Sequence, residues 1–317
     1  MFHRILFSLG IFFLCGHLSI GAQTPDAAVR FYEHGTRSFQ QGDLDGAISD
    51  FTKAIEISSS LVPSRSARHT SLPGVNGFAD SAEADGIMVI DPFTANAYTS
   101  RGLARYRKGD IDEAITDWDR AIRINPGLAA AYLDRGCAQY AKRDAQRAIA
   151  DWNRALQINP NLSQAYSNRG AARQDLGDTE RALADLNQAI ALDPREGVYY
   201  CNRGYTWLAK RDLDRATLDF NRALELSPQM AAAYHGRGIA RMSRNDLDAA
   251  ITDFNRALGI DPNLPKTYMS RGLALLLQGK DDAAKKDFER CLMLKPDARD
   301  ELEQRKSLAR ELLSTKH

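Results

Sequence analysis

The side chains that most often perform catalysis or bind metal ions are few and widely separated in this sequence. No two histidines lie three or four residues apart, the spacing that places two ligands on one face of a helix, so a metal site is not expected. Serines concentrate between residues 58 and 81 and lack the glycine-flanked motif of a hydrolase nucleophile. We therefore expect a protein that is not an enzyme and that holds no cofactor or metal. The histidines are His3, His17, His34, His69, His235 and His317.

The charge balance argues against a nucleic-acid partner. The chain has 317 residues, with 42 basic and 41 acidic side chains interspersed along it. A protein that binds phosphates by releasing their counterions needs a surplus of Lys and Arg on one face. The composition is that of an ordinary soluble protein.

Residues 1–22 have the pattern of a secretory signal. Arg4 precedes the apolar run ILFSLGIFFLC, and small residues follow it, including Gly21 and Ala22. This pattern predicts export to the periplasm or the cell exterior, and the alternative is an uncleaved membrane anchor. Cleavage would leave three cysteines, an odd number that argues against a disulfide framework. We expect these three to be small packing residues: Cys137, Cys201 and Cys291.

A 34-residue period organises residues 95–298. Glycine, alanine and proline each recur at this interval in six consecutive units, as is typical of tandem repeats. A tyrosine stands four residues before each glycine, and a bulky apolar residue, such as Trp152 or Phe254, stands sixteen residues after it. The recurring glycines are Gly102, Gly136, Gly170, Gly204, Gly238 and Gly272.

Each unit is predicted to form two helices, because apolar residues recur three and four apart in both halves. Between the halves, Gly109, Gly177, Gly279 or Asn245 can adopt the left-handed conformation that ends a helix, whereas Arg143 and Arg211 predict less well specified turns. A proline ends the second helix. An aspartate that can cap the second helix follows most of these turns and a turn near residue 42: Asp43, Asp110, Asp144, Asp178, Asp212 and Asp246.

These features resemble the tetratricopeptide repeat family, whose units are helical hairpins of 34 residues with small residues where the helices cross. The resemblance implies an all-α fold, a right-handed α-solenoid of about seven helix-turn-helix repeats with a C-terminal capping helix. One departure is consistent: the family commonly has Leu before the glycine, and this chain has Arg.

That arginine has a predicted partner. If each glycine packs against the alanine twelve residues later, Arg169 and Asp185 lie on neighbouring turns of the two helices. The same pairing is available in all six units, where we expect it to fix the register, with ligand binding by the arginines as the alternative. The other five pairs are Arg101 with Asp117, Arg135 with Asp151, Arg203 with Asp219, Arg237 with Asp253, and Arg271 with Asp287.

Three irregular segments flank or interrupt the array. Residues 28–59 are predicted to form a first, degenerate unit, and residues 60–91 a Ser-rich insertion that forms an exposed, disordered loop, with a functional loop as the alternative. Residues 299–317 are predicted to form a helix that caps the array, with a coiled-coil partner helix as the alternative. Its expected apolar stripe is Leu302, Leu308, Leu312 and Leu313.

Resemblance to the family implies that the first helices line a concave groove. A short polar strip of Asp134, Asn168 and Asn202 would run through it, similar to the asparagine ladder of O-linked N-acetylglucosamine transferases, and would hold the backbone of an extended peptide. The alternatives are a polar face that binds nothing tightly and, for Tyr205 and Met242, a packing role. The other expected groove residues are Leu103, Tyr106, Leu133, Tyr140, His235 and Ile239.

The sequence thus predicts a protein–protein interaction scaffold that binds an extended or helical peptide segment in its groove. The alternative is a membrane-anchored structural spacer in an envelope assembly. A clamp for a terminal carboxylate is not expected, because no unit has a Lys three residues before the glycine or an Asn one residue after it. The predicted partner is a protein or peptide of unassigned identity, and the oligomeric state is open.

Overall fold

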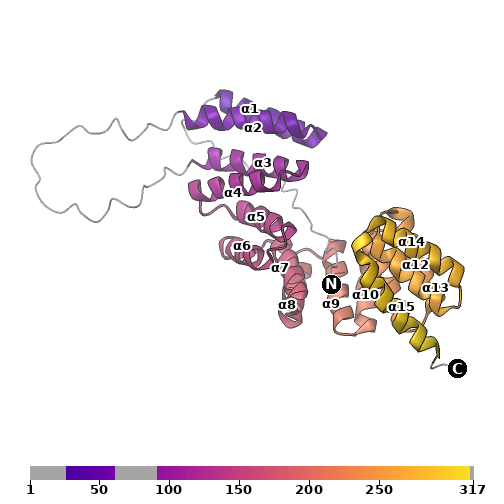
Figure 1. Ribbon diagram of the computed structural model, residues 1–317. Helices are drawn as coiled ribbons and strands as arrows, with labels where there is room; N and C mark the ends of the chain where they lie inside the picture. Colours follow the sequence, from indigo (N-terminus) through magenta and orange to yellow (C-terminus); the bar gives the residue numbers. More distant parts are fainter. Residues whose placement is uncertain (1–25, 61–90, 315–317) are drawn as a thin grey trace, which may run out of the picture. The chain divides into compact units, whose positions relative to one another are not determined.

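The computed structural model describes residues 26–60 and 91–314, and within these ranges it contains helices and no strands (Figure 1). The predicted signal, most of the insertion and the last three residues lie outside the described residues. The helices are α1 (Asp26–Gln41), α2 (Leu44–Ser59), α3 (Pro92–Lys108), α4 (Ile111–Ile124), α5 (Ala129–Ala141), α6 (Ala145–Ile158), α7 (Ser163–Asp175), α8 (Thr179–Leu192), α9 (Gly197–Ala209), α10 (Leu213–Leu226), α11 (Ala231–Ser243), α12 (Leu247–Ile260), α13 (Pro265–Leu277), α14 (Asp281–Leu294) and α15 (Arg299–Ser314).

Consecutive helices pair as hairpins, which confirms the predicted all-α repeat fold. The chain divides into two compact units whose boundary lies within α7, between residues 165 and 166. In the N-terminal unit, α1 packs on α2, α3 on α4 and α5 on α6, and the hairpins contact each other through α2 with α3 and α4 with α5. In the C-terminal unit, α9 packs on α10, α11 on α12 and α13 on α14. No helix of the described residues has both the length and the apolar character needed to cross a bilayer.

The turns inside the hairpins share one backbone conformation. Gly109, Gly177 and Gly279 have φ values of 103°, 82° and 74°, as the sequence predicts. Arg143 and Arg211 adopt the same left-handed conformation, with φ of 68° and 60°. This conformation costs a residue with a Cβ roughly 1–2 kcal/mol, so packing of the two helices must enforce the turn there.

Aspartate capping of the second helices is confirmed in five of the six predicted places. The side chains of Asp43, Asp144, Asp178, Asp212 and Asp246 accept hydrogen bonds from amides in the first turn. The prediction is wrong for Asp110, whose side chain makes no such bond. That helix begins without a side-chain cap.

The recurring glycines lie where the two helices of a hairpin cross. A Cβ built on Gly136 would lie 2.7 Å from Nε1 of Trp152, and one built on Gly170 would lie 3.1 Å from the carbonyl oxygen of Ala182. Gly236 makes a close approach that the period does not predict: a Cβ there would lie 2.3 Å from Cζ of Phe220 in the preceding hairpin. Glycine at these positions lets the bulky ring of the second helix press against the first.

Helix α15 packs against α13 at the end of the C-terminal unit. Leu302 and Ala309 are its buried apolar residues and join a cluster with Met269 and Phe288. Leu308 is 58% exposed, so its predicted place in the apolar stripe is wrong. Residues 302 and 309 are two helical turns apart, so they lie on the same side of α15, and this side makes the contact.

Candidate functional site

All six predicted arginine–aspartate pairs are present. In each hairpin the guanidinium donates from Nε and Nη2 to the two oxygens of the aspartate, at 2.6–2.9 Å. Such bidentate pairs are among the strongest hydrogen bonds in proteins and fix direction as well as distance. The guanidinium also lies 5.2–5.6 Å from the ring centre of the tyrosine one turn earlier, a cation–π contact.

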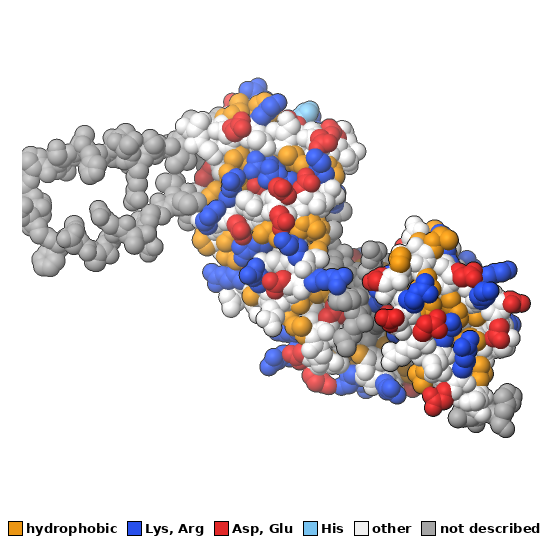
Figure 2. All heavy atoms as spheres, viewed as in Figure 1, with side chains coloured by type: hydrophobic (Ala, Val, Ile, Leu, Met, Phe, Trp, Pro, Cys, Tyr) orange, Lys and Arg blue, Asp and Glu red, His pale blue; other side chains and the backbone are white. Residues whose placement is uncertain are grey.

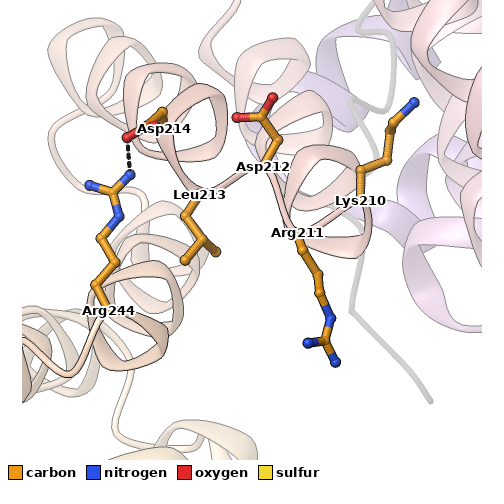
Figure 3. Close-up of a pocket in the computed structure, with 6 residues that line it drawn as sticks. All are labelled: Lys210, Arg211, Asp212, Leu213, Asp214 and Arg244. Carbon is orange, nitrogen blue, oxygen red and sulfur yellow. Dashed lines mark hydrogen bonds and ion pairs between the residues drawn. The ribbon is translucent and has the colours of Figure 1, made fainter.

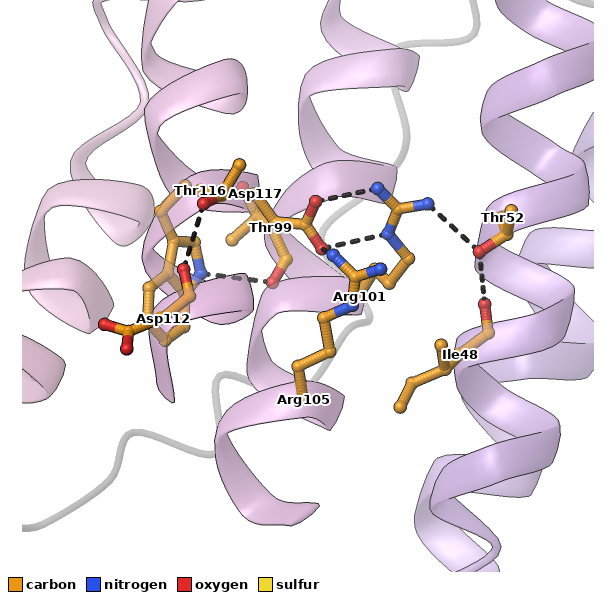
Figure 4. A network of polar contacts seen from close by, with 9 residues as sticks. Ile48, Thr52, Thr99, Arg101, Arg105, Asp112, Thr116 and Asp117 are labelled. Atoms are coloured by element: carbon orange, nitrogen blue, oxygen red, sulfur yellow. Dashed lines mark hydrogen bonds and ion pairs between the residues drawn. The ribbon is translucent and has the colours of Figure 1, made fainter. Parts of the chain in front are cut away.

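The same arginines connect successive hairpins, which the sequence analysis did not foresee. Figure 4 shows Arg101 between Asp117 of its own hairpin and Thr52 on α2, whose hydroxyl accepts from Nη1 at 3.0 Å. The side chain that accepts from Nη1 elsewhere stands on the second helix of the preceding hairpin. These contacts are Arg135 with Asp119, Arg203 with Asn187, Arg237 with Asn221, and Arg271 with Asn255. The spacing could have revealed them, since donor and acceptor are 16 residues apart.

These contacts give the arginines a structural role. A guanidinium that binds its own aspartate, the preceding hairpin and a tyrosine ring has little donor capacity left for a ligand. Hairpin α1/α2 keeps the aspartate but not the arginine: Nδ1 of His34 lies 2.5 Å from Oδ2 of Asp50, and the imidazole is 63% exposed. The first hairpin therefore has a smaller, more exposed version of the pair.

A second set of ion pairs lies at the ends of the hairpins. Figure 3 shows a surface depression lined by Lys210, Arg211, Asp212, Leu213, Asp214 and Arg244. Arg244 pairs with Asp214, and Lys210 pairs with Glu180 of the preceding hairpin. Basic and acidic side chains are interleaved over the face drawn in Figure 2. The depression belongs to this charged surface, and its lining offers one apolar side chain to a ligand.

The residues predicted to line the groove separate into two groups. Tyr106, Tyr140, His235, Ile239 and Met242 are partly exposed. The others are buried, which leaves them little surface open to a groove: Leu103, Leu133, Asp134, Asn168, Asn202 and Tyr205. Neighbouring hairpins approach closely enough to enclose these positions.

Two of the buried residues connect neighbouring hairpins. Nδ2 of Asn202 donates to Oγ of Ser167 at 3.1 Å, so this amide joins α9 to α7 instead of facing a peptide. The hydroxyl of Tyr205 donates to the carbonyl oxygen of Ala232 on α11 at 2.7 Å, and its ring packs edge-on against Phe220. The packing alternative therefore holds for Tyr205.

His235 also has partners inside the protein. Its Nδ1 lies 3.0 Å from the hydroxyl of Thr267 on α13, and its ring lies 5.7 Å from that of Phe254. In the part of the chain that the structure describes, no group of three or more His, Cys, Asp or Glu side chains could hold a metal ion. The three cysteines, Cys137, Cys201 and Cys291, are buried thiols, as predicted.

Asp134 differs from the rest of the predicted polar strip. It is 7% exposed, and the structure gives its carboxylate no hydrogen bond or ion pair with any described residue. Burial raises the pKa of this carboxyl from its usual 3.8 to about 7. Asp134 also raises the pKa of the Tyr106 phenol on α3, after the larger effects of burial and of Cys137.

Family models match most of the repeat array. Models described as tetratricopeptide repeat match residues 135–199, 168–231 and 265–298, and one described as TPR repeat matches residues 102–142 and 240–279. Together they cover more than half of the chain. The chain belongs to the tetratricopeptide repeat family.

Proteins of known sequence and structure are similar to this chain. The chain is 34% identical over 102 residues to "Heat shock protein STI1" of Saccharomyces cerevisiae, a match that covers 31% of this chain and 17% of that protein's length. A tetratricopeptide repeat protein from Parabacteroides merdae matches with a TM-score of 0.64 and 16% identity, over 89% of this chain and all of that one. A structure of the APC/C hetero-tetramer Cut9-Hcn1 matches with a TM-score of 0.62 and 21% identity, over 67% of this chain and 42% of that one.

The two structural matches show the fold, and tetratricopeptide repeats are the architecture of a protein-interaction scaffold. In this tetratricopeptide repeat chain, the six arginine–aspartate pairs lie along one edge of the hairpins. The second set of ion pairs lies at the ends of the hairpins. The partly exposed apolar positions of the first helices pack against the core on one side and meet solvent on the other.

Asp134 makes stability depend on pH. Because its pKa is higher in the folded protein than in the unfolded chain, the folded state holds a proton that the unfolded state releases between about pH 4 and pH 7. Stability should fall as the pH rises through this window. Asp134→Asn should therefore unfold with a free energy about 1–3 kcal/mol higher than the wild type at pH 8 and nearly the same at pH 4.5, measured by urea denaturation. An equal gain at both pH values would show that the charge of Asp134 is not the cause.

Proposed function

We propose that this tetratricopeptide repeat chain binds a segment of a partner protein over the first helices of its hairpins. The observation that supports this proposal is a repeating one. Four residues after the hairpin glycine stand Tyr106 and Tyr140 in the N-terminal unit, and Leu208 and Met242 in the C-terminal unit, all partly exposed.

In each unit these side chains come from helices that contact one another. Helix α3 contacts α5, and α9 contacts α11, so each pair of side chains stands at the same register on adjacent helices. Tyr106 and Tyr140 lie with their rings 6.0 and 6.1 Å from those of Trp118 and Trp152, which hold them from behind. Rigid aromatic and flexible thioether side chains of this kind are enriched where proteins bind each other.

The position four residues after the hairpin glycine is not apolar and exposed in every hairpin. Gln174 stands there on α7, and Leu276 on α13 is buried. We therefore assign binding to two patches: the α3/α5 patch of Tyr106 and Tyr140, and the α9/α11 patch of Leu208 and Met242. If residues 1–22 act as a secretory signal, the partner is periplasmic or extracellular.

Selection of binding peptides tests this function. A displayed library of random peptides is selected on the full-length chain, and the Kd of the selected peptides is measured by fluorescence anisotropy. We expect Tyr106→Ser with Tyr140→Ser, or Leu208→Ser with Met242→Ser, to weaken the peptides of the corresponding patch about tenfold or more.

Leu218→Ser is the matched control. Leu218 is 67% exposed on the second helix α10, so its replacement removes a similar apolar side chain from outside both patches. Helicity of every variant is checked by circular dichroism. Peptides whose affinity depends on Leu218 but not on either patch would move the binding surface to the second helices and contradict the proposal.

A further inference from the structure

Asp134 is a buried carboxylate for which the described protein supplies no counter-charge. A charge in such a place is costly unless it is paired and hydrogen-bonded. The residue is 7% exposed, and neither carboxylate oxygen is fully enclosed. The carboxylate therefore keeps a narrow contact with the surface.

The arginines closest to Asp134 in the repeat register already bind other aspartates. Arg135, the next residue, binds Asp151 and Asp119. Arg101 and Arg105, on the neighbouring first helix α3, both bind Asp117. None of these three arginines is left to neutralise Asp134.

The surroundings of Asp134 suit the binding of a cation. On α5, residues one turn away in each direction are small: Ala130 before it, and Cys137 and Ala138 after it. Helix α3 contacts α5, and on α3 Tyr106 is partly exposed; the Asp134 charge also raises the pKa of the Tyr106 phenol, after burial and Cys137. A carboxylate beside an accessible aromatic ring offers both an ion pair and a cation–π contact.

We propose that Asp134 and Tyr106 form a site for a Lys or Arg side chain of the partner segment that binds the α3/α5 patch. This inference rests on the proposed function and names the chemistry that one of its two patches recognises. A charged anchor in a mostly apolar patch fixes the register of the bound segment, because a shifted segment would leave the buried carboxylate unpaired.

The other hairpins have no such site. On α1 the register of Asp134 holds Glu33, which is exposed, and the other five units of the 34-residue array carry uncharged side chains there, with glycine in one case. These residues are Ser100, Asn168, Asn202, Gly236 and Ser270. The site is therefore local to the N-terminal unit, where it would select one basic residue of the partner.

Two matched peptide libraries test the inference. They are identical random nine-residue libraries except for the central residue, which is lysine in one and norleucine in the other. Both are bound to the full-length protein and to Asp134→Asn, which places at this position the residue that α7 and α9 carry at the same register. We expect the wild type to retain the lysine library about tenfold better than the norleucine library, and Asp134→Asn to lose this preference while still retaining both.

Asp112→Asn is the control for the loss of one negative charge. Asp112 stands on α4 in the same unit and is exposed, so its replacement should leave the lysine preference unchanged. Tyr106→Leu should reduce the preference without abolishing it, since the ion pair remains.

The outcomes separate the two proposals. If the wild type retains both libraries equally, or Asp134→Asn keeps the lysine preference, the cation site is wrong and peptide binding stands. If neither library is retained while the chain is folded by circular dichroism, the proposed function fails and the cation site fails with it.

Discussion

Replacement of Asp117 by alanine is expected to lower the free energy of unfolding of the N-terminal unit by about 3–5 kcal/mol, the cost of leaving a buried charge unpaired. Asp117 is fully buried and accepts from Arg101 through two hydrogen bonds and from Arg105 through a third, at 2.7–2.9 Å. Its removal leaves two guanidinium groups facing an enclosed space. Arg101 is itself buried, so water cannot replace the carboxylate there (Figure 4).

The measurement is urea denaturation followed by circular dichroism, with attention to whether the unit separates from the rest of the array, because repeat proteins unfold in segments when one interface weakens. Asp112→Ala is the matched control. Asp112 pairs with Lys142 but is 76% exposed, and surface pairs contribute about 0–1 kcal/mol. Equal losses in the two variants would show that the buried ladder contributes no more than the ion pairs at the hairpin tips.

Replacement of Trp152 by alanine is expected to destabilise the same unit by a similar amount, about 3–5 kcal/mol. The indole is fully buried, its Nε1 donates to the carbonyl oxygen of Leu133 at 3.2 Å, and it fills the space that Gly136 leaves open. Alanine would leave a cavity between α5 and α6, and the backbone carbonyl would lose its donor. Tyr140, whose ring packs on Trp152, would lose its support.

Trp152→Phe keeps an aromatic ring at the helix crossing and removes the hydrogen bond to Leu133. It therefore separates the loss of packing volume from the loss of this bond. Phenylalanine occupies the same register at residues 220, 254 and 288, where the recurring glycine meets its ring. We expect this variant to remain folded and to cost clearly less than alanine in thermal denaturation. A phenylalanine variant as unstable as the alanine variant would show that the hydrogen bond to Leu133 dominates.

Much of the architecture is predictable from the sequence because the repeat is regular. Six glycines at one interval, each followed by an alanine twelve residues later, predict six crossings, and all six arginine–aspartate pairs follow from that register. The regularity also shows where local rules are overridden: Arg211 takes the left-handed turn conformation that its own side chain disfavours, because the two helices it joins must pack.

The candidate site was predicted less well. Tyr106, Tyr140, Ile239 and Met242 are partly exposed as expected, but the polar strip of Asp134, Asn168 and Asn202 is enclosed. A period gives the side of a helix on which a residue stands. It does not give the distance to the next hairpin, and this distance decides whether that side meets solvent.

The sequence by itself determined the repeat, the two helices of each unit, their turns and the aspartate partners of the recurring arginines, because these depend on spacing within one hairpin. The tertiary structure alone decided which polar residues are buried, that Asn202 binds Ser167, that Gly236 makes room for Phe220, and that Asp134 has no partner among the described residues. These features depend on contacts between successive hairpins. The separation there is set by the summed packing of many side chains, which no single repeat encodes.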